Sequence, residues 1–191
     1  MPTIINGTTG IDTIQDGIIT VNKIASGAVT DAKIAAMAAT KLTGQVPDAN
    51  APSGSVIQVV SATYATQVST SGGTYISSGL TASITPSSSA NKVLVIITDP
   101  MRKVGTVQGI NLALYRNGSS IYQPMSSFGY SNPSTADFSS LLSFSYLDSP
   151  ATTASTSYTL YFHVNNSGTA YAQIDNNIGN TANIILMEIA A

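Results

Sequence analysis

From Ser55 to the C-terminus, apolar and polar residues alternate in short runs that are typical of β-strands. The alternation is clearest from Tyr158 to Val164, where it places Leu160 and Phe162 on one face and Tyr161 and His163 on the other. Turns rich in glycine, proline, asparagine and serine separate the runs. The expected strands are Val56–Tyr64, Tyr75–Thr85, Lys92–Asp99, Ile110–Arg116, Leu141–Asp148, Ser157–Val164, Ala170–Ile174 and Asn183–Glu188.

Two features of this region predict how the strands are used. Asn117-Gly118 lies between two strand-like runs and predicts a two-residue hairpin turn. Val93–Ile97 is an unbroken apolar run, which is expected of a strand covered on both faces. In an oligomer, the second covering layer could come from a neighbouring subunit. About eight strands without an intervening helix predict an all-β sandwich or barrel.

The first forty residues follow a different pattern, with a period of ten. Isoleucine recurs at this spacing, and Gly7, Gly17 and Gly27 keep the same period. Units this short are too small to build a core, so the repeat predicts stacking against identical segments of other copies. Residues 1–44 are therefore expected to form a stalk or anchor. Its associating positions are Ile4, Ile14, Ile24 and Ile34.

A short helix and a linker are expected between the repeat and the strands. Thr30-Asp31 can cap a helix over about residues 31–42, and Gly44 can end it. The alternative is a lone surface helix on the following domain. Residues 45–54 contain two prolines and end in glycine, which is typical of a linker. The predicted organisation is a stalk over 1–44, a linker over 45–54 and a β-sandwich head over 55–191.

The composition restricts the possible partners. Only 8% of the residues are charged, against about 25% in an ordinary soluble domain. Such a neutral polar surface fits an obligate oligomer or a densely packed assembly, because little charge repulsion opposes association. A net charge of −2 without a basic patch argues against nucleic acid. No apolar run reaches the roughly 18 residues of a membrane helix, so membrane insertion is not expected.

Residues that could support catalysis are scarce. His163 is the only histidine and lies within an expected strand, and the chain has no cysteine. The Asp and Glu residues form no recognisable catalytic pair, and no Gly-x-Ser-x-Gly motif occurs. Asp175-Asn-Asn177 comes nearest to a calcium loop but is more typical of a turn. We therefore expect no enzyme activity, no metal and no cofactor.

Binding is better supported by the residues than catalysis is. Gln123–Asp137 is the longest stretch without a strand pattern in the head, and it carries aromatic residues among small ones. An aromatic ring can stack on a sugar, while amide and carboxylate groups can bind its hydroxyls. The candidate receptor-binding residues are Phe128, Tyr130, Asn132 and Asp137. The alternative is that these aromatic residues seal a subunit contact or the end of the barrel.

A series of short segments resembles the head domain of bacteriophage fibre and other virion structural proteins of the marine and cyanobacterial phage type. They follow one another in order: Gly54–Val60, Ser83–Val95, Tyr146–Ala151, Gly168–Tyr171 and Ile184–Ile189. Decapeptides similar to Gly27–Ala35 also recur in phage fibre proteins. The resemblance implies a trimeric jelly-roll head on a short trimeric stalk. Long tail fibres have many hundreds of residues, whereas this chain has 191, which favours a small tip, head or baseplate fibre.

Together these observations predict a non-enzymatic, homotrimeric virion fibre protein, located at a tail fibre, at the baseplate or on the capsid surface. Its N-terminal segment would attach to other virion proteins, and its head would bind a host surface polysaccharide or lipopolysaccharide. Several weak sites would then act together through avidity. The alternatives are a decoration protein of capsid or baseplate without receptor binding, a bacterial surface lectin, and a polysaccharide-degrading enzyme.

Overall fold

A computed structural model describes residues 51–105, 109–130, 137–164, 168–174 and 180–191. The chain divides into two units, Met1–Gln45 and Val46–Ala191. All described residues belong to the second unit, which we call the head domain. The predicted stalk with Ile4, Ile14, Ile24 and Ile34, and the predicted helix over 31–42, lie outside the described residues.

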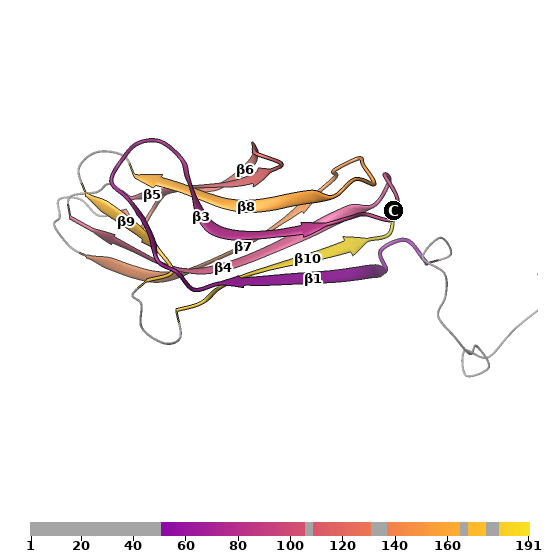
Figure 1. Cartoon of the computed structure of the whole chain (residues 1–191), viewed down its shortest axis with the longest axis horizontal. Coiled ribbons are helices and arrows are strands. Elements are labelled where there is room, and N and C mark those ends of the chain that lie inside the picture. The colour runs from indigo at the N-terminus through magenta and orange to yellow at the C-terminus, as the bar shows by residue number, and fades with distance from the viewer. Residues whose placement is uncertain (1–50, 106–108, 131–136, 165–167, 175–179) are drawn as a thin grey trace, which may run out of the picture. The chain divides into compact units, whose positions relative to one another are not determined.

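The head domain is a sandwich of two antiparallel sheets (Figure 1). The first sheet has the order β1-β10-β4-β9-β2, with β7 paired to the other side of β4, and the second has the order β3-β8-β5-β6. The all-β class and the two-sheet sandwich predicted from the sequence are thereby confirmed. The strands are β1 Val56–Tyr64, β2 Val68–Thr70, β3 Ile76–Ile84, β4 Lys92–Val104, β5 Ile110–Arg116, β6 Ser119–Phe128, β7 Phe138–Asp148, β8 Thr156–Val164, β9 Thr169–Ala172 and β10 Ala182–Ile189.

The eight longer strands are ordered as in a jelly roll, with β1, β10, β4 and β7 facing β3, β8, β5 and β6. Pairing of β1 with β10 brings the beginning and the end of the head domain together. There, the Gly54 amide donates to the Ala190 carbonyl over 2.9 Å, and the Ala190 amide donates to the Ser55 carbonyl over 2.9 Å. We call this the entry end, because the preceding chain joins the domain at Ala51.

The core lies between the sheets and follows the alternation of the strands. Val93, Val95 and Ile97 of β4 point inward and are fully buried. Leu160 and Phe162 of β8 meet them from the second sheet within one hydrophobic cluster. Leu160 and Phe162 therefore share one face of β8, as predicted, and the structure shows that this face points inward. Leu94 and Ile96 of β4, in contrast, lie on the outer face of the first sheet and are only partly buried.

β4 is longer than predicted, because it continues through Pro100 to Val104. One side of β4 pairs with β7 along nearly its whole length, whereas the other side pairs first with β10 and then with β9. Pro100 lies where β10 gives way to β9, between the pairings of Thr98 and Met101. A proline, which lacks an amide donor, is tolerated at such a break in the ladder.

The predicted hairpin is confirmed, but its second strand is longer than the sequence pattern suggested. Asn117 and Gly118 have φ angles of 48° and 82°, as the two central residues of a type I′ turn require. β6 then continues to Phe128 as the edge strand of its sheet, so the predicted irregular stretch Gln123–Asp137 is partly wrong. Three register shifts against β5 and the position at the sheet edge accommodate Pro124, which breaks the strand pattern in the sequence.

Candidate functional site

The residues predicted to bind a receptor do not form one surface cluster. Phe128 ends β6 and packs against the core, with its ring 5.4 Å from that of Phe138 at 83°. Gly129 has a φ of 72°, and a Cβ atom there would lie only 2.3 Å from Cδ1 of Phe138. This close approach explains the glycine, and the ring contact packs the end of β6 against the start of β7.

The other three predicted residues have different surroundings. Tyr130 is 55% exposed and follows a tight turn in which its amide donates to the Ser127 carbonyl over 3.0 Å. Asp137 accepts a hydrogen bond from Nη2 of Arg102 over 2.7 Å, in an exposed ion pair. Asn132 lies outside the described residues. Tyr130 is therefore the one aromatic residue of this predicted group that the described structure presents to solvent.

A different group of aromatic side chains occupies the outer face of the second sheet. We call Tyr75, Tyr115, Tyr161 and His163 the tyrosine cluster. Ala113 of β5 lies opposite Tyr161 of β8 in the strand register. Because Ala113 is small, the ring of Tyr115, two residues along β5, can lean across it toward Tyr161. Tyr75 immediately precedes β3, which pairs with the other edge of β8.

The rings of the tyrosine cluster contact one another directly. Tyr115 and Tyr161 are stacked, with ring centroids 3.9 Å apart, and the Tyr75 ring meets His163 edge-on at 4.3 Å. All three tyrosines remain partly exposed, whereas His163 is buried beneath them. Partial burial, and secondarily the neighbouring Tyr115, raise the pKa of Tyr75. Nδ1 of His163 is buried and has no hydrogen-bond partner among the described residues.

Sequence reasoning missed this cluster because its members are far apart in the chain. Tyr75, Tyr115 and Tyr161 belong to three different expected strands, and each looks like an ordinary strand aromatic. The alternation did place Tyr161 and His163 on one face. It could not show that β3 and β5 flank β8 in the same sheet, because strand order depends on long-range pairing.

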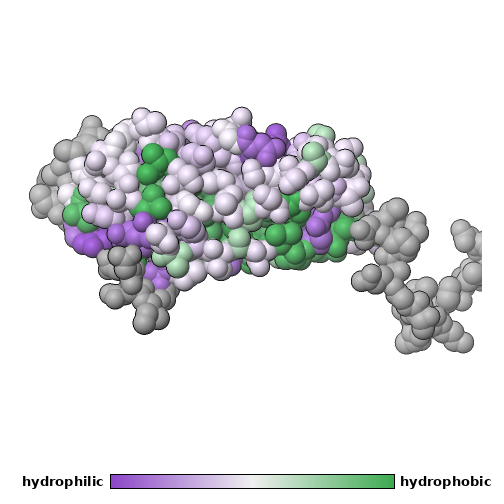
Figure 2. All heavy atoms as spheres, viewed as in Figure 1, coloured by the Kyte–Doolittle hydropathy of each residue, from purple (hydrophilic) through white to green (hydrophobic). Residues whose placement is uncertain are grey.

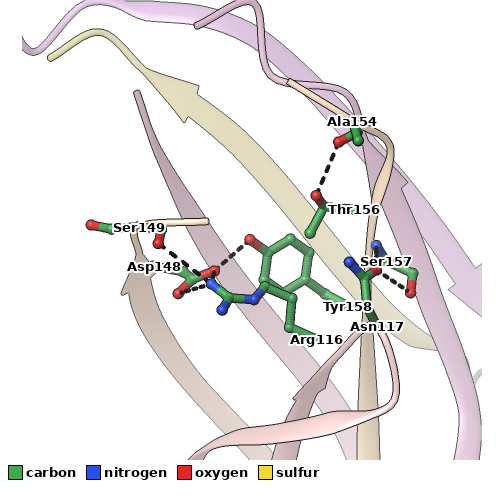
Figure 3. Close-up of polar contacts among 8 residues, drawn as sticks. All are labelled: Arg116, Asn117, Asp148, Ser149, Ala154, Thr156, Ser157 and Tyr158. Carbon is green, nitrogen blue, oxygen red and sulfur yellow. Dashed lines mark hydrogen bonds and ion pairs between the residues drawn. The ribbon is translucent and has the colours of Figure 1, made fainter. Parts of the chain in front are cut away.

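A buried polar network joins the two sheets near the entry end (Figure 3). Nη1 of Arg116, at the end of β5, contacts Oδ1 and Oδ2 of Asp148 at 3.0 and 2.8 Å. The hydroxyl of Tyr158 in β8 donates to Oδ2 of Asp148 over 2.7 Å. Burial, followed by the hydrogen bond to Asp148, raises the pKa of Tyr158. Asp148 ends β7 in the first sheet, so this network fastens the sheets together and is not free for chemistry.

Replacing Tyr158 by phenylalanine should lower the free energy of unfolding by about 1–2 kcal/mol, because a hydrogen bond to a buried carboxylate is lost while Arg116 still neutralises it. Urea unfolding of Tyr158→Phe measures this loss. Tyr122→Phe is the matched control, since the Tyr122 ring stacks on Tyr146 and its hydroxyl has no hydrogen bond to a described residue. Equal losses in the two variants would contradict a stabilising role of the network.

A second buried carboxylate, Glu188, lies on the same inner face of the first sheet. The register places it opposite Val93, which is in turn opposite Asp148. Glu188 is fully buried and accepts hydrogen bonds from Gln58, Asn91 and Ser87. The oxygens of Asp148 and Glu188 thus all accept hydrogen bonds from other residues of the domain. We therefore give both carboxylates a structural role and not a role in a binding cleft.

The described residues contain few features of other site types. A pocket of about 520 Å³ at the entry end is lined by Ala51, Ser87, Ser88, Ala90, Asn91, Ala190 and Ala191. Within the described ranges, no group of three or more His, Asp or Glu side chains is placed to hold a metal ion. No helix in the described part of the chain is long and apolar enough to cross a membrane.

Comparisons with known proteins reveal distant structural similarity only. No protein-family model and no curated protein matches the chain. The VP2 subviral particle of infectious bursal disease virus aligns with a TM-score of 0.38 and 15% identity over 72% of this chain and 38% of that chain. The Gt and Gx strain structures of that virus align with TM-scores of 0.36 and 0.37 and with 14% and 19% identity, covering 78% of this chain and 42% of theirs. The chain thus spans about two fifths of these chains.

Proposed function

We propose that this protein is a homotrimeric structural component of a virion, and that its head domain binds a glycan on the host surface. The tyrosine cluster is the observation that carries the binding part of this proposal. The Tyr115 ring lies between those of Tyr75 and Tyr161, and the three partly exposed rings form a continuous aromatic surface on the sheet. Such rings provide apolar faces for a sugar and hydroxyl groups for hydrogen bonds, and they lose little conformational freedom on binding.

The composition and the resemblance to phage fibre proteins support the structural part of the proposal. Only 8% of the chain is charged, which suits a protein that is packed among identical copies and other virion proteins. The decapeptide repeat supplies the expected means of bringing copies together. Weak glycan sites on three heads, and on several trimers per particle, would then combine into firm attachment.

Binding to host polysaccharide should fall about tenfold or more per site in Tyr161→Ala, and similarly in Tyr115→Ala, because the stacked surface is lost. The measurement is a glycan array followed by titration of the recognised glycan with wild type and variants. Thermal unfolding of each variant shows that the head remains folded. Tyr161→Phe, which keeps the ring, should retain most of the affinity.

Tyr130→Ala is the matched control, since Tyr130 is exposed but lies outside the tyrosine cluster. If Tyr130→Ala abolishes binding and the cluster variants do not, the receptor site is the loop predicted from the sequence. If no glycan or host polysaccharide binds the wild-type protein, the receptor-binding part of the proposal is wrong. A decoration role on capsid or baseplate would then account for the same fold.

A further inference from the structure

The outer face of the first sheet carries an apolar patch that no other described residue of the head domain covers. Strand register aligns one row of apolar residues across four strands: Val59, Met187, Leu94 and Leu147. Val59 at 56% and Leu147 at 49% are among the most exposed large apolar residues of the described chain. Figure 2 shows apolar residues gathered along β1 and β10 toward the entry end.

The neighbouring rows show where the patch ends. In the next row Ile185 and Ile96 are flanked by Ser61 and Ser145, and the following row consists entirely of polar residues. On the other side Val56 pairs with Ile189, close to where the chain enters. With strands about 4.8 Å apart, the patch measures roughly 15 Å in each direction, which approaches the size that marks interaction surfaces.

We infer that this patch faces the axis of the oligomer and packs against the same region of the neighbouring copies of the chain. The position of the patch supports this choice of partner. Residues 1–50 join the head at Ala51, and Val56, only five residues later, already belongs to the patch. Repeats that associate with those of other copies would therefore hold the heads together at this end. The inference rests on the oligomeric state in the proposed function and names the surface that the heads use.

The chemistry of the patch also fits an identical partner. Next to the apolar rows, the outer face carries one charged residue, Lys92 at the end of β4. Arg102 lies on the same face of β4 but beyond the polar row, where it pairs with Asp137. Two copies can therefore meet without opposing like charges or burying unpaired ones. Tethering by the repeats raises the effective concentration of the heads, so a modest apolar contact is sufficient. Association would also cover Leu94 and Ile96 on the outer face of β4. The unbroken apolar run Val93–Ile97 predicts a strand that is covered on both faces in this way.

The absence of cysteine from the chain allows a direct test in the full-length protein. Single cysteines at Leu147 and Val59 report on the patch. A cysteine at Leu141 is the control, because Leu141 is 60% exposed and lies on the outer face of the same strand as Leu147, beyond the polar row. Light scattering of each variant gives the oligomeric state, and the rate of maleimide labelling gives the accessibility.

We expect multimers of the 19.6 kDa chain in which Leu147→Cys and Val59→Cys are labelled at least about tenfold more slowly than Leu141→Cys. Denaturation should abolish the difference. Multimers in which all three cysteines react equally fast would overturn the inference and leave the proposed function standing. A monomer would overturn the inference and also the homotrimer in the proposed function. Glycan binding is measured separately and does not depend on either result.

Discussion

Replacing Glu188 by alanine should lower the free energy of unfolding by about 3–5 kcal/mol, because several buried donors lose their acceptor at once. Oε1 accepts from the amide and the hydroxyl of Ser87 and from Nδ2 of Asn91, all within 2.8 Å. Oε2 accepts from Nε2 of Gln58 over 2.6 Å. These donors come from β1 and from the connection between β3 and β4, so the carboxylate ties two separate segments to β10. Urea unfolding of Glu188→Ala measures the loss.

Glu188→Gln separates the loss of charge from the loss of the acceptor. Its carbonyl oxygen can still accept from Ser87 and Asn91, but its amide faces Nε2 of Gln58, which is also a donor. Gln58 cannot turn its amide without losing its bond to the Thr85 carbonyl, which is 2.8 Å long. We expect a loss of about 1–2 kcal/mol for this variant. A Glu188→Ala loss no larger than that of Glu188→Gln would contradict the assigned role.

Glu188 also predicts how stability responds to acid. Burial raises its pKa, but the hydrogen bonds from Asn91, Gln58 and Ser87 outweigh burial and leave the pKa below its usual value. A carboxylate with a lowered pKa stabilises the fold above its unfolded pKa, and this stabilisation is lost as the pH falls through the folded pKa. The wild-type protein should therefore lose stability below about pH 4.5, the ordinary value for glutamate.

The sequence allowed the strands and the core to be predicted, because alternation reports directly on which residues face inward. Strand ends were predicted less well where the backbone depends on distant partners. Pro100 looked like the end of a strand, but the change of neighbour from β10 to β9 accommodates it. β9 ends at Ala172, earlier than expected, because Gln173 adopts a φ of 53° that strands do not permit. The three-residue strand β2 was not predicted.

The candidate sites were harder to predict than the fold. The tyrosine cluster and the apolar patch each consist of residues from three or four strands, so they exist only once strand order and register are known. These two surfaces belong to opposite sheets of the sandwich. Heads that pack through the outer face of the first sheet therefore leave the second sheet facing away from the contact. Association and glycan binding are thus compatible within one head domain.

Asp99→Asn should stabilise the head domain at pH 8 by about 2–4 kcal/mol and have little effect near pH 4. Asp99 is fully buried on the inner face of β4 and accepts hydrogen bonds from the amide and from Nε2 of Gln173. Burial raises its pKa to about 7, although these two hydrogen bonds oppose the shift. Ionisation of Asp99 therefore costs more in the folded protein than in the unfolded chain.

The sign of this pH dependence is opposite to that of Glu188. Because the pKa of Asp99 is raised from 3.8 to about 7, the folded state binds more protons between these pH values, and stability falls as the pH rises through this window. Oε1 of Gln173 is buried without a hydrogen-bond partner among the described residues. If the Gln173 amide turns over, this oxygen can accept from protonated Asp99. Asparagine can donate to it in the same way at every pH.

Urea unfolding of wild type and Asp99→Asn from pH 4 to pH 8 tests this account. The free energy of unfolding of the two proteins should begin to differ at about pH 4, and the difference should grow until about pH 7 and then stay constant. These limits correspond to the pKa of Asp99 in the unfolded chain, 3.8, and in the folded protein, about 7. Asp137→Asn, which removes an exposed carboxylate paired with Arg102, should change stability little over the same range. A constant difference between wild type and Asp99→Asn would mean that Asp99 ionises as readily in the fold as in the unfolded chain. The effects of Glu188 and Asp99 on stability oppose each other along the pH scale. The wild-type protein should therefore be most stable in mildly acidic solution, where Glu188 is ionised and Asp99 is still protonated.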